Sequence, residues 1–209
     1  IIAIDDRSED RTGRIISSFA QKNSKIIHVT AEPKPENWMG KNWACFEGFK
    51  RSTGELLLFT DADTKHSRKI ISLSVSHLLS ENLDALTAIP KMLCLDFWTR
   101  ITLPMLSTFL HTRFSALRVN DPSKKTGYFF GSFFIIRREV YESVGTHEGV
   151  KGEIVEDGAL GKKVKESGFK MKMVRAEHLL EAVWARDLPT LWHALKRLMI
   201  PLYLQNKKI

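Results

Sequence analysis

Two carboxylates one residue apart, Asp61 and Asp63, are the residues whose types and spacing point most directly to chemistry. They follow Leu56 to Phe59, a continuous apolar run that is typical of a strand buried on both faces. Carboxylates at the carboxyl end of such a strand lie where open α/β sheets bind ligands. Hard cations such as Mg2+ and Mn2+ prefer oxygen ligands and often keep substrate phosphates as ligands. The triplet therefore predicts a metal held against a diphosphate, and its alternative is a turn that caps the next helix.

Two further acidic pairs stand at predicted element boundaries. Asp5 and Asp6 end the apolar run of residues 1–4, where paired acids can accept hydrogen bonds from a nucleobase imide or a ribose hydroxyl. Turn chemistry explains that pair equally well. Glu156 and Asp157 precede a predicted helix that ends near Ser167. Asp157 can cap this helix, or it can act as a general base if it faces an acceptor hydroxyl across a cleft.

A lysine and a glycine add to these candidates. Lys41 ends a loop with two prolines and stands where a predicted helix over residues 42–50 begins. A phosphate there would meet both the ammonium group and the positive end of the helix dipole, while the alternative is a solvated lysine. Gly131 interrupts the apolar run of residues 127–136, which we predict to be a strand. A glycine inside a strand indicates a close approach of backbone and ligand.

The elements that must position these residues follow from hydrophobic periodicity and from glycine and proline breaks. Strands are predicted over residues 1–4, 25–29, 56–60, 84–89 and 127–136. Helices are predicted over residues 12–21, 42–50, 70–79, 137–144 and 158–167, with a basic helix over 189–204. Each candidate side chain thus lies at or near the end of an element, where its backbone is fixed and its side chain is free to face a ligand.

The segment of residues 97–119 is ambiguous. Apolar residues recur at helical spacing, and Pro104 is expected to kink or restart the helix. The stripe consists of Phe97, Ile101, Met105, Phe109, Leu110, Phe114 and Leu117, with Arg100, Arg113 and Arg118 on the remaining surface. A basic, aromatic-rich amphipathic helix can lie in a membrane interface. Such a stripe is more often core, and core is our expectation.

Bulk composition limits the classes of protein. The 209 residues fit one folded domain, with 43% hydrophobic and 27% charged residues. The formal net charge of +8 suits phosphate-bearing ligands, nucleic acid or an anionic membrane surface. Cys45 and Cys94 lack metal-site spacing, so neither zinc nor a disulfide framework is indicated and a reducing, cytosolic compartment is favoured. No run of about 18 apolar residues predicts a complete transmembrane helix.

The motifs, in their order along the chain, resemble those of the inverting family 2 glycosyltransferases. They are Asp5-Asp6-x-Ser8-x-Asp10-x-Thr12, Gly40-Lys41, Asp61-x-Asp63, Gly131, Arg137 or Arg138, Tyr141, Gly145 and Glu156-Asp157. The stretch Trp38-x-Gly40-Lys41-x-x-Ala44 is similar to the members that glycosylate membrane lipids such as hopanoids, carotenoids or ceramide. This resemblance covers nearly the whole chain.

The resemblance implies a GT-A fold, which is an α/β (Rossmann-like) fold with a mostly parallel sheet, helices on both faces and the nucleotide-sugar site at the strands' carboxyl ends. It implies that Asp5 or Asp6 contacts the nucleoside of a donor, with a UDP-sugar favoured. Asp61 and Asp63 would hold Mn2+ or Mg2+ against the diphosphate, with Lys41 and Asp61 among the donor contacts. Asp157 would be the catalytic base, and Gly131, Glu156 and Arg186 would be further sugar or acceptor contacts.

Departures from the family pattern add expectations. The family's first strand precedes Asp5-Asp6, so residues 1–209 are expected to be one catalytic domain that lacks this strand. A membrane segment is a further expectation after the apolar residues 198–204. The Gln-x-x-Arg-Trp motif of processive members is replaced by Val183-Trp184-Ala185-Arg186-Asp187, which disfavours polymerisation. Arg186 or Arg197 could reach the diphosphate, although a solvated basic helix is the simpler interpretation.

The predicted function is metal-dependent, inverting, non-processive transfer of a sugar to a hydroxyl acceptor, expected to be a lipid, at the cytoplasmic face of a membrane. Other classes stay open. A catalytically silent relative or a nucleotidyltransferase-like domain would also use strand-end carboxylates. A basic module that binds nucleic acid or a membrane surface would fit the net charge, but the lysines and arginines are scattered and no nucleic-acid motif is found, so nucleic acid is not an expected partner.

Overall fold

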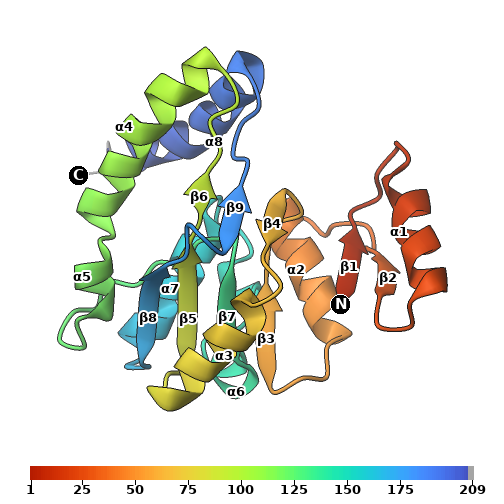
Figure 1. Cartoon of the computed structure of the whole chain (residues 1–209), viewed down its shortest axis with the longest axis horizontal. Helices are drawn as coiled ribbons and strands as arrows, with labels where there is room; N and C mark the ends of the chain where they lie inside the picture. The colour runs from red at the N-terminus through yellow and green to blue at the C-terminus, as the bar shows by residue number, and fades with distance from the viewer. Residues whose placement is uncertain (207–209) are drawn as a thin grey trace.

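Strands and helices alternate along the chain, as the sequence predicts (Figure 1). The computed structural model describes the backbone of residues 1–206 and the side chains of residues 1–200. Its strands are β1 (Ile2–Asp5), β2 (Ile27–Thr30), β3 (Leu56–Phe59), β4 (Thr64–His66), β5 (Ala85–Ile89), β6 (Lys91–Met92), β7 (Phe134–Arg137), β8 (Met171–Arg175) and β9 (Leu180–Ala182). Its helices are α1 (Thr12–Lys22), α2 (Gly40–Lys50), α3 (Ile70–Ser80), α4 (Phe97–Arg113), α5 (Ala116–Asn120), α6 (Arg138–Ser143), the 3-10 helix η1 (Glu148–Val150), α7 (Glu156–Glu166) and α8 (Leu188–Asn206).

The strands form three hydrogen-bonded sheets. The central sheet has the order β3-β7-β5-β8, β1 pairs with β2, and β4-β9-β6 forms a small third sheet. Strands β3, β5 and β8 run in one direction and β7 runs against them, so β3-β7 and β5-β7 are antiparallel while β5-β8 is parallel. Three of the four strands of the central sheet therefore run in the same direction, as expected of a mostly parallel sheet. Strand β7 is the reversed one.

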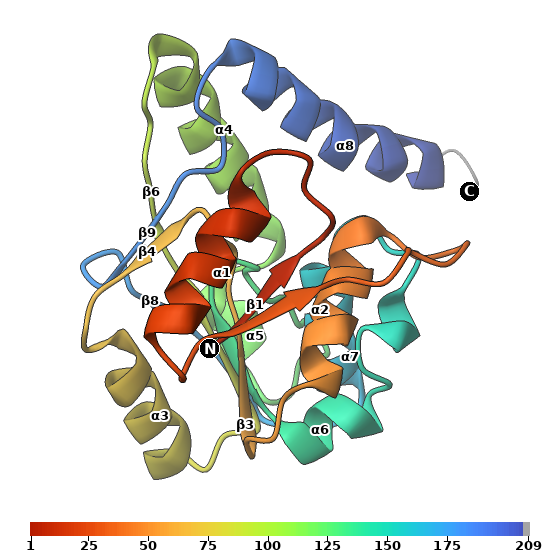
Figure 2. The same ribbon diagram turned by 90° about the vertical axis from the view of Figure 1, so that its right-hand side faces the viewer.

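Helices cover both faces of the central sheet, as expected (Figure 2). Successive side chains of a strand point to opposite faces. Leu57 therefore packs with α6 and α7 in one apolar cluster, whereas Leu56 and Leu58 pack with α3 in another. The alternation explains why β3 reads as an uninterrupted apolar run. Asp61 lies just past the carboxyl end of this strand.

The predicted strand over residues 127–136 is wrong in its first half. Only Phe134–Arg137 is strand β7, and residues 127–133 form an irregular segment beside α7. This segment packs so tightly that a Cβ at Gly127 would lie 1.9 Å from the carbonyl oxygen of Gly161. Phe129 and Phe133 are fully buried without being part of a strand. Apolar residues therefore mark burial here, and close backbone packing prevents strand pairing.

The expectation that the α4 stripe is core is also wrong. Phe97, Ile101 and Met105 are 66%, 48% and 69% exposed, and the buried side chains of α4 are Thr99 and Leu103. Helix α4 continues through Pro104 as one element. Its buried edge packs through Leu103 in a small cluster with Ala185 and Leu191. Periodicity identified one apolar side of the helix, but the helix packs on its neighbours through a different side.

No helix within residues 1–206 is both long enough and apolar enough to cross a membrane. The predicted basic helix over residues 189–204 is found as α8, which begins at Leu188. The side chains of residues 201–204, at the apolar end where a membrane segment was considered, lie outside the described residues.

Candidate active site

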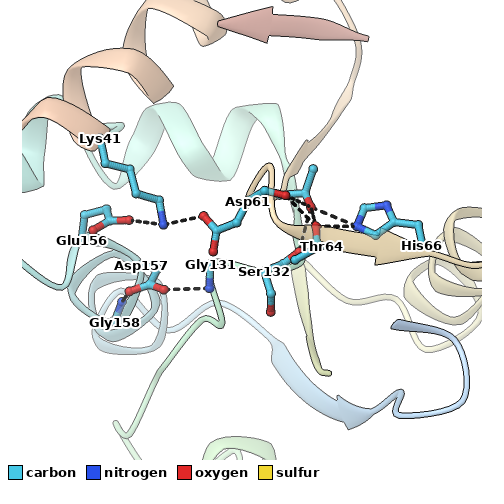
Figure 3. A network of polar contacts seen from close by, with 10 residues as sticks. Lys41, Asp61, Thr64, His66, Gly131, Ser132, Glu156, Asp157 and Gly158 are labelled. Atoms are coloured by element: carbon cyan, nitrogen blue, oxygen red, sulfur yellow. Dashed lines mark hydrogen bonds and ion pairs between the residues drawn. The ribbon is translucent and has the colours of Figure 1, made fainter. Parts of the chain in front are cut away.

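Three charged side chains from three elements meet beyond the carboxyl end of β3 (Figure 3). Lys41 lies in the first turn of α2, Asp61 follows β3, and Glu156 begins α7. The Nζ atom of Lys41 is 2.7 Å from Oδ1 of Asp61 and 2.8 Å from Oε1 of Glu156. Burial alone would lower the pKa of Lys41, but the neighbouring carboxylates raise it above its ordinary value. Lys41 is therefore a permanent cation that joins the loop after β3 to α7.

Asp157 lies beside this cluster and is held by two backbone donors. The N–H of Gly131 donates to Oδ2 of Asp157 at 2.7 Å, and the N–H of Gly158 donates to Oδ1 at 2.7 Å (Figure 3). Burial and the adjacent charge of Glu156 raise the pKa of Asp157 to about 6. This carboxylate is ionised at neutral pH, is fixed in orientation, and is more basic than an exposed aspartate. Those are the properties of a general base.

Gly131 lies at the centre of the cluster. A Cβ at this position would be 2.7 Å from Oδ2 of Asp157, 2.8 Å from Nζ of Lys41 and 3.2 Å from Oδ2 of Asp61. Any larger residue would push these charged groups apart. The close approach predicted for this glycine is thus found, and the groups it approaches are the candidate catalytic side chains.

Replacing Gly131 by alanine is expected to lower kcat/KM by about a hundredfold while leaving the protein folded, because misplacing reacting groups by about 1 Å has costs of that order. Steady-state kinetics and a thermal melt measure the two quantities. Gly152→Ala is the matched control, since its Cβ would have its nearest contact at 3.9 Å, from Asn37. Equal activity of the Gly131→Ala variant and the wild type would contradict this assignment.

The donor set at the Asp61–Asp63 turn fits a hard cation that takes its remaining ligands from substrate. Burial and the charge of Asp61 raise the pKa of Asp63, so the two carboxylates are close enough to repel each other. A divalent cation would relieve that repulsion. Within the described residues no group of three or more acidic, histidine or cysteine side chains is arranged to hold a metal. Two carboxylates with phosphate and water oxygens nevertheless make a common Mg2+ environment.

A hydroxyl and imidazole network that the sequence did not predict holds this turn in place (Figure 3). Thr64 Oγ1 donates to the carbonyl of Asp61 at 2.6 Å, and Thr60 Oγ1 donates to the carbonyl of Ser132 at 2.8 Å. The ring of His66 lies 3.0 Å from Thr60 Oγ1. The turn is therefore tied to the segment that carries Gly131. In the sequence, this network could have been suspected from Thr60 and Thr64, the two threonines that flank residues 61–63.

A cavity of about 1320 Å³ lies next to these residues. Part of its lining is formed by the candidate site residues Lys41, Asp61, Asp63, Gly131, Glu156 and Asp157. Much of the rest comes from α4, α8 and the segment before α8, with the apolar residues Leu103, Leu106, Leu110, Trp184 and Ala194, and further charged residues also line the cavity, namely Lys91, Arg175, Glu177 and Arg197. This volume exceeds the usual range for a single small ligand, about 300–1,000 Å³. It has room for a charged ligand and an apolar ligand together.

Three predicted site residues lie outside the cavity lining. Asp5 is buried and accepts a hydrogen bond from the N–H of Ser8 at 2.9 Å. A Cβ at Gly40 would lie 3.3 Å from Oδ2 of Asp6. Asp6 therefore lies next to the start of α2, where Lys41 follows Gly40 in the sequence. Arg186 is exposed, and its charge opposes the rise in the pKa of Asp63. The structure therefore brings together Lys41, Asp61, Asp63, Gly131, Glu156 and Asp157, and it leaves these three at the periphery.

A sheet of this order, with helices on both faces and acidic groups beyond the strand ends, defines a GT-A fold, the class of nucleotide-sugar glycosyltransferases. The family described as Glycosyl transferase family 2 matches residues 1–145, and this chain belongs to that family. The family assignment confirms the resemblance seen in the motifs.

Relatives with curated names include the 4,4'-diaponeurosporenoate glycosyltransferase of Staphylococcus haemolyticus (strain JCSC1435), which is 25% identical over 165 residues. That match covers 77% of this chain and 42% of the relative. The protein of the same name from Staphylococcus aureus (strain USA300) is 24% identical with the same coverage. The chain thus spans less than half the length of the curated relatives it matches.

Solved structures show the same fold. A mannosyltransferase from Pyrobaculum calidifontis in complex with GDP-Man and Mn2+ is 19% identical, with a TM-score of 0.58, over 88% of this chain and 46% of that chain. TarS 1-349 of S. aureus in complex with UDP-GlcNAc is 14% identical, with a TM-score of 0.62, over 90% of this chain and 50% of that chain.

Proposed function

We propose that residues 1–209 act as one catalytic domain, which transfers a sugar from a nucleoside-diphosphate sugar to a hydroxyl acceptor with inversion at the anomeric carbon. The observation that carries this proposal is the carboxylate of Asp157. It is held by two backbone N–H groups at 2.7 Å each and lies in the same cavity as Lys41 and the Asp61–Asp63 turn. A candidate general base thus shares one cavity with a lysine and two carboxylates that could hold a cation against a leaving group.

The donor diphosphate is assigned to the side of the cavity that carries Lys41, Asp61 and Asp63. Asp61 and Asp63 would hold Mn2+ or Mg2+, and a bound cation neutralises charge on the leaving diphosphate. Lys41 supplies a fixed positive charge at the start of α2, where backbone N–H groups also favour phosphate. Asp6, beside Gly40, would contact the nucleoside, and Asp5 would hold the loop through the hydrogen bond that it accepts from Ser8. A UDP-sugar is the favoured donor, in keeping with the UDP-GlcNAc complex of one structural neighbour.

Transfer then requires one displacement. The acceptor oxygen bonds to the anomeric carbon, the bond from that carbon to the diphosphate oxygen breaks with its electron pair on the diphosphate, and the hydroxyl proton moves to Asp157. Gly131 and Gly158 hold the carboxylate in position for this proton. Because one base and one displacement suffice, the sugar configuration inverts. Glu156 keeps Lys41 in place through its 2.8 Å ion pair.

The acceptor is assigned to the apolar wall of the cavity. Leu103, Leu106 and Leu110 of α4 line the same cavity as Asp157. A lipid whose hydroxyl reaches Asp157 could pack its apolar part against these leucines. The names of the curated relatives refer to diaponeurosporenoate, which supports a lipid as the acceptor class. Work on such an acceptor would place the enzyme at the cytoplasmic face of a membrane and would be a single, non-processive transfer.

The pKa of Asp157 predicts the acid limb of the pH profile. Because its pKa is raised to about 6, the carboxylate is ionised above that pH and becomes protonated below it. A protonated base cannot accept the acceptor proton, so kcat/KM should fall about tenfold per pH unit below pH about 6. Glu153→Gln, which alters an exposed carboxylate close by, should keep the same profile. A rate that stays constant down to pH about 4.5 would contradict the assigned base.

Calorimetric titration of the complete protein with UDP, with and without Mn2+, tests the donor site. The proposal predicts binding that strengthens with Mn2+, and absence of UDP binding under both conditions would refute the assignment of a UDP-sugar donor. Donor hydrolysis then separates the alternatives. Release of UDP from a UDP-sugar supports a transferase, release of pyrophosphate from a nucleoside triphosphate indicates a nucleotidyltransferase, and binding with neither release indicates a catalytically silent domain.

A further inference from the structure

Exposed apolar side chains concentrate on α4, α5 and α8. More than half of the large apolar side chains that are exposed among the described residues lie on these helices. On α4 they are Phe97, Trp98, Ile101, Met105 and Phe109, on α5 Leu117, and on α8 Leu188, Trp192, Met199 and Ile200. The α4 residues recur at a spacing of four, which places them along one side of the helix. Exposed apolar side chains gathered on neighbouring helices in this way favour an interaction site.

The same helices carry only basic charge. Their sequences contain no aspartate or glutamate. The basic residues Arg100, Arg113, Arg118, Lys196 and Arg197 are all exposed, and within the described side chains none of them forms an ion pair. Apolar and cationic side chains therefore share these helices, and the nearest carboxylates in sequence stand only at the helix ends, at Asp96, Asp121 and Asp187.

Helices α4 and α8 lie against each other at one end of the molecule, away from α3 and α6 (Figure 1 and Figure 2). They also form much of the apolar wall of the cavity, through residues such as Leu106 and Ala194. The side chains of Trp98, Ile101, Met105 and Trp192 do not line that cavity. The two helices thus present one set of side chains to the cavity and another to the outside.

We propose that this surface of α4, α5 and α8 docks the protein on an anionic lipid bilayer. Tryptophan and other aromatic side chains favour the boundary between lipid headgroups and acyl chains, and arginine and lysine pair with anionic headgroups. Docking would bring the helices that wall the cavity onto the bilayer. If the acceptor is a lipid, as the proposed function has it, this lipid would reach Asp157 between these helices from the membrane side.

Charge complementarity favours an anionic bilayer, and not a second copy of this chain, as the partner that binds this surface. In a symmetric dimer the same surface of both copies would meet, so arginines would face arginines without an acidic partner. An anionic bilayer supplies the missing negative charge and also solvates the apolar stripe. Nucleic acid would match the charge but would leave Phe97, Ile101 and Met105 exposed to water.

The test is cosedimentation of the complete protein with vesicles of phosphatidylcholine alone and with added phosphatidylglycerol. Trp98→Ser combined with Met105→Ser removes part of the apolar surface, and Arg100→Gln combined with Arg113→Gln removes part of its charge. The matched controls are Ile71→Ser with Leu79→Ser on α3 and Arg14→Gln with Lys22→Gln on α1, all exposed positions away from this surface. Thermal melts verify that every variant is folded.

The proposal predicts tighter binding to the anionic vesicles, by about tenfold or more, and weaker binding as salt is raised. Both variants of the surface should lose most of this binding, and both controls should keep it. No binding, equal losses in the controls, or a salt-dependent dimer that forms through this surface without vesicle binding would overturn the proposal. UDP release with water as acceptor should be unchanged in all four variants, so failure of docking and failure of the proposed function are distinguishable.

Discussion

Asp157→Asn is expected to lower kcat for sugar transfer by about a thousandfold, because positioned general bases contribute about 10²–10⁴ in rate. The amide oxygen of asparagine can still accept one of the two backbone N–H groups that hold Asp157, but its NH2 group cannot accept the other, so one of the two contacts should be kept. The affinity for UDP should change little, since the diphosphate is assigned to Lys41 and the Asp61–Asp63 turn. Steady-state kinetics and calorimetry with UDP measure the two effects separately.

Glu153→Gln is the control for this experiment. Glu153 is an exposed carboxylate just before α7, and its hydrogen bonds are made by its backbone: its carbonyl accepts from Asn42 and its N–H donates to the carbonyl of Val150. Its replacement removes the same charge near the site without touching the proposed base. A thousandfold loss in both variants would indicate a general electrostatic effect. Full activity of Asp157→Asn would exclude Asp157 as the base.

The second large effect is expected from Asp61→Ala combined with Asp63→Ala. Removing both carboxylates should abolish the dependence of UDP binding on Mn2+ and lower kcat/KM by about a hundredfold or more, because stabilisation of a leaving diphosphate by a cation is worth several kcal/mol. Loss of Asp61 also frees Lys41 from one of its two ion pairs. Titration with Mn2+ while UDP binding is followed gives the direct measurement.

Glu32→Ala combined with Glu36→Ala is a matched control, since both glutamates are exposed in the loop before α2. This variant should bind UDP with the same Mn2+ dependence as the wild type. If instead the Asp61, Asp63 double variant kept that dependence, the metal would have to be held elsewhere and the role given to this turn would be wrong.

The sequence predicted the elements around the site well where local signals were strong. Residues 56–59 form β3 as expected, since four apolar residues ended by a polar turn admit few other structures. Lys41, Asp61 and Asp157 were each placed at element boundaries, and the fold brings them together. Parallel strands and helix N-termini meet at one edge of such a sheet, so boundary residues far apart in sequence converge there.

Long-range packing could not be predicted from the sequence. The 2.8 Å contact of Lys41 with Glu156 joins residues more than a hundred positions apart, and neither residue shows this partner locally. Strand β4 has three residues and exists because it pairs with β9, a distant segment. The apolar stripe of α4 is exposed because the helix packs through Leu103 instead. Periodicity defines a face of a helix but not what covers it.

The proposed reaction is the transfer of a sugar from a nucleoside-diphosphate donor in this cavity. The most direct measurement is proton NMR of the anomeric signal while the complete protein is incubated with nucleotide-sugars, Mn2+ and a lipid extract. We expect release of the nucleoside diphosphate and a glycoside of inverted anomeric configuration, both lost in Asp157→Asn. A folded protein that releases no nucleoside diphosphate from any donor, or a product with retained configuration, would contradict the proposed function.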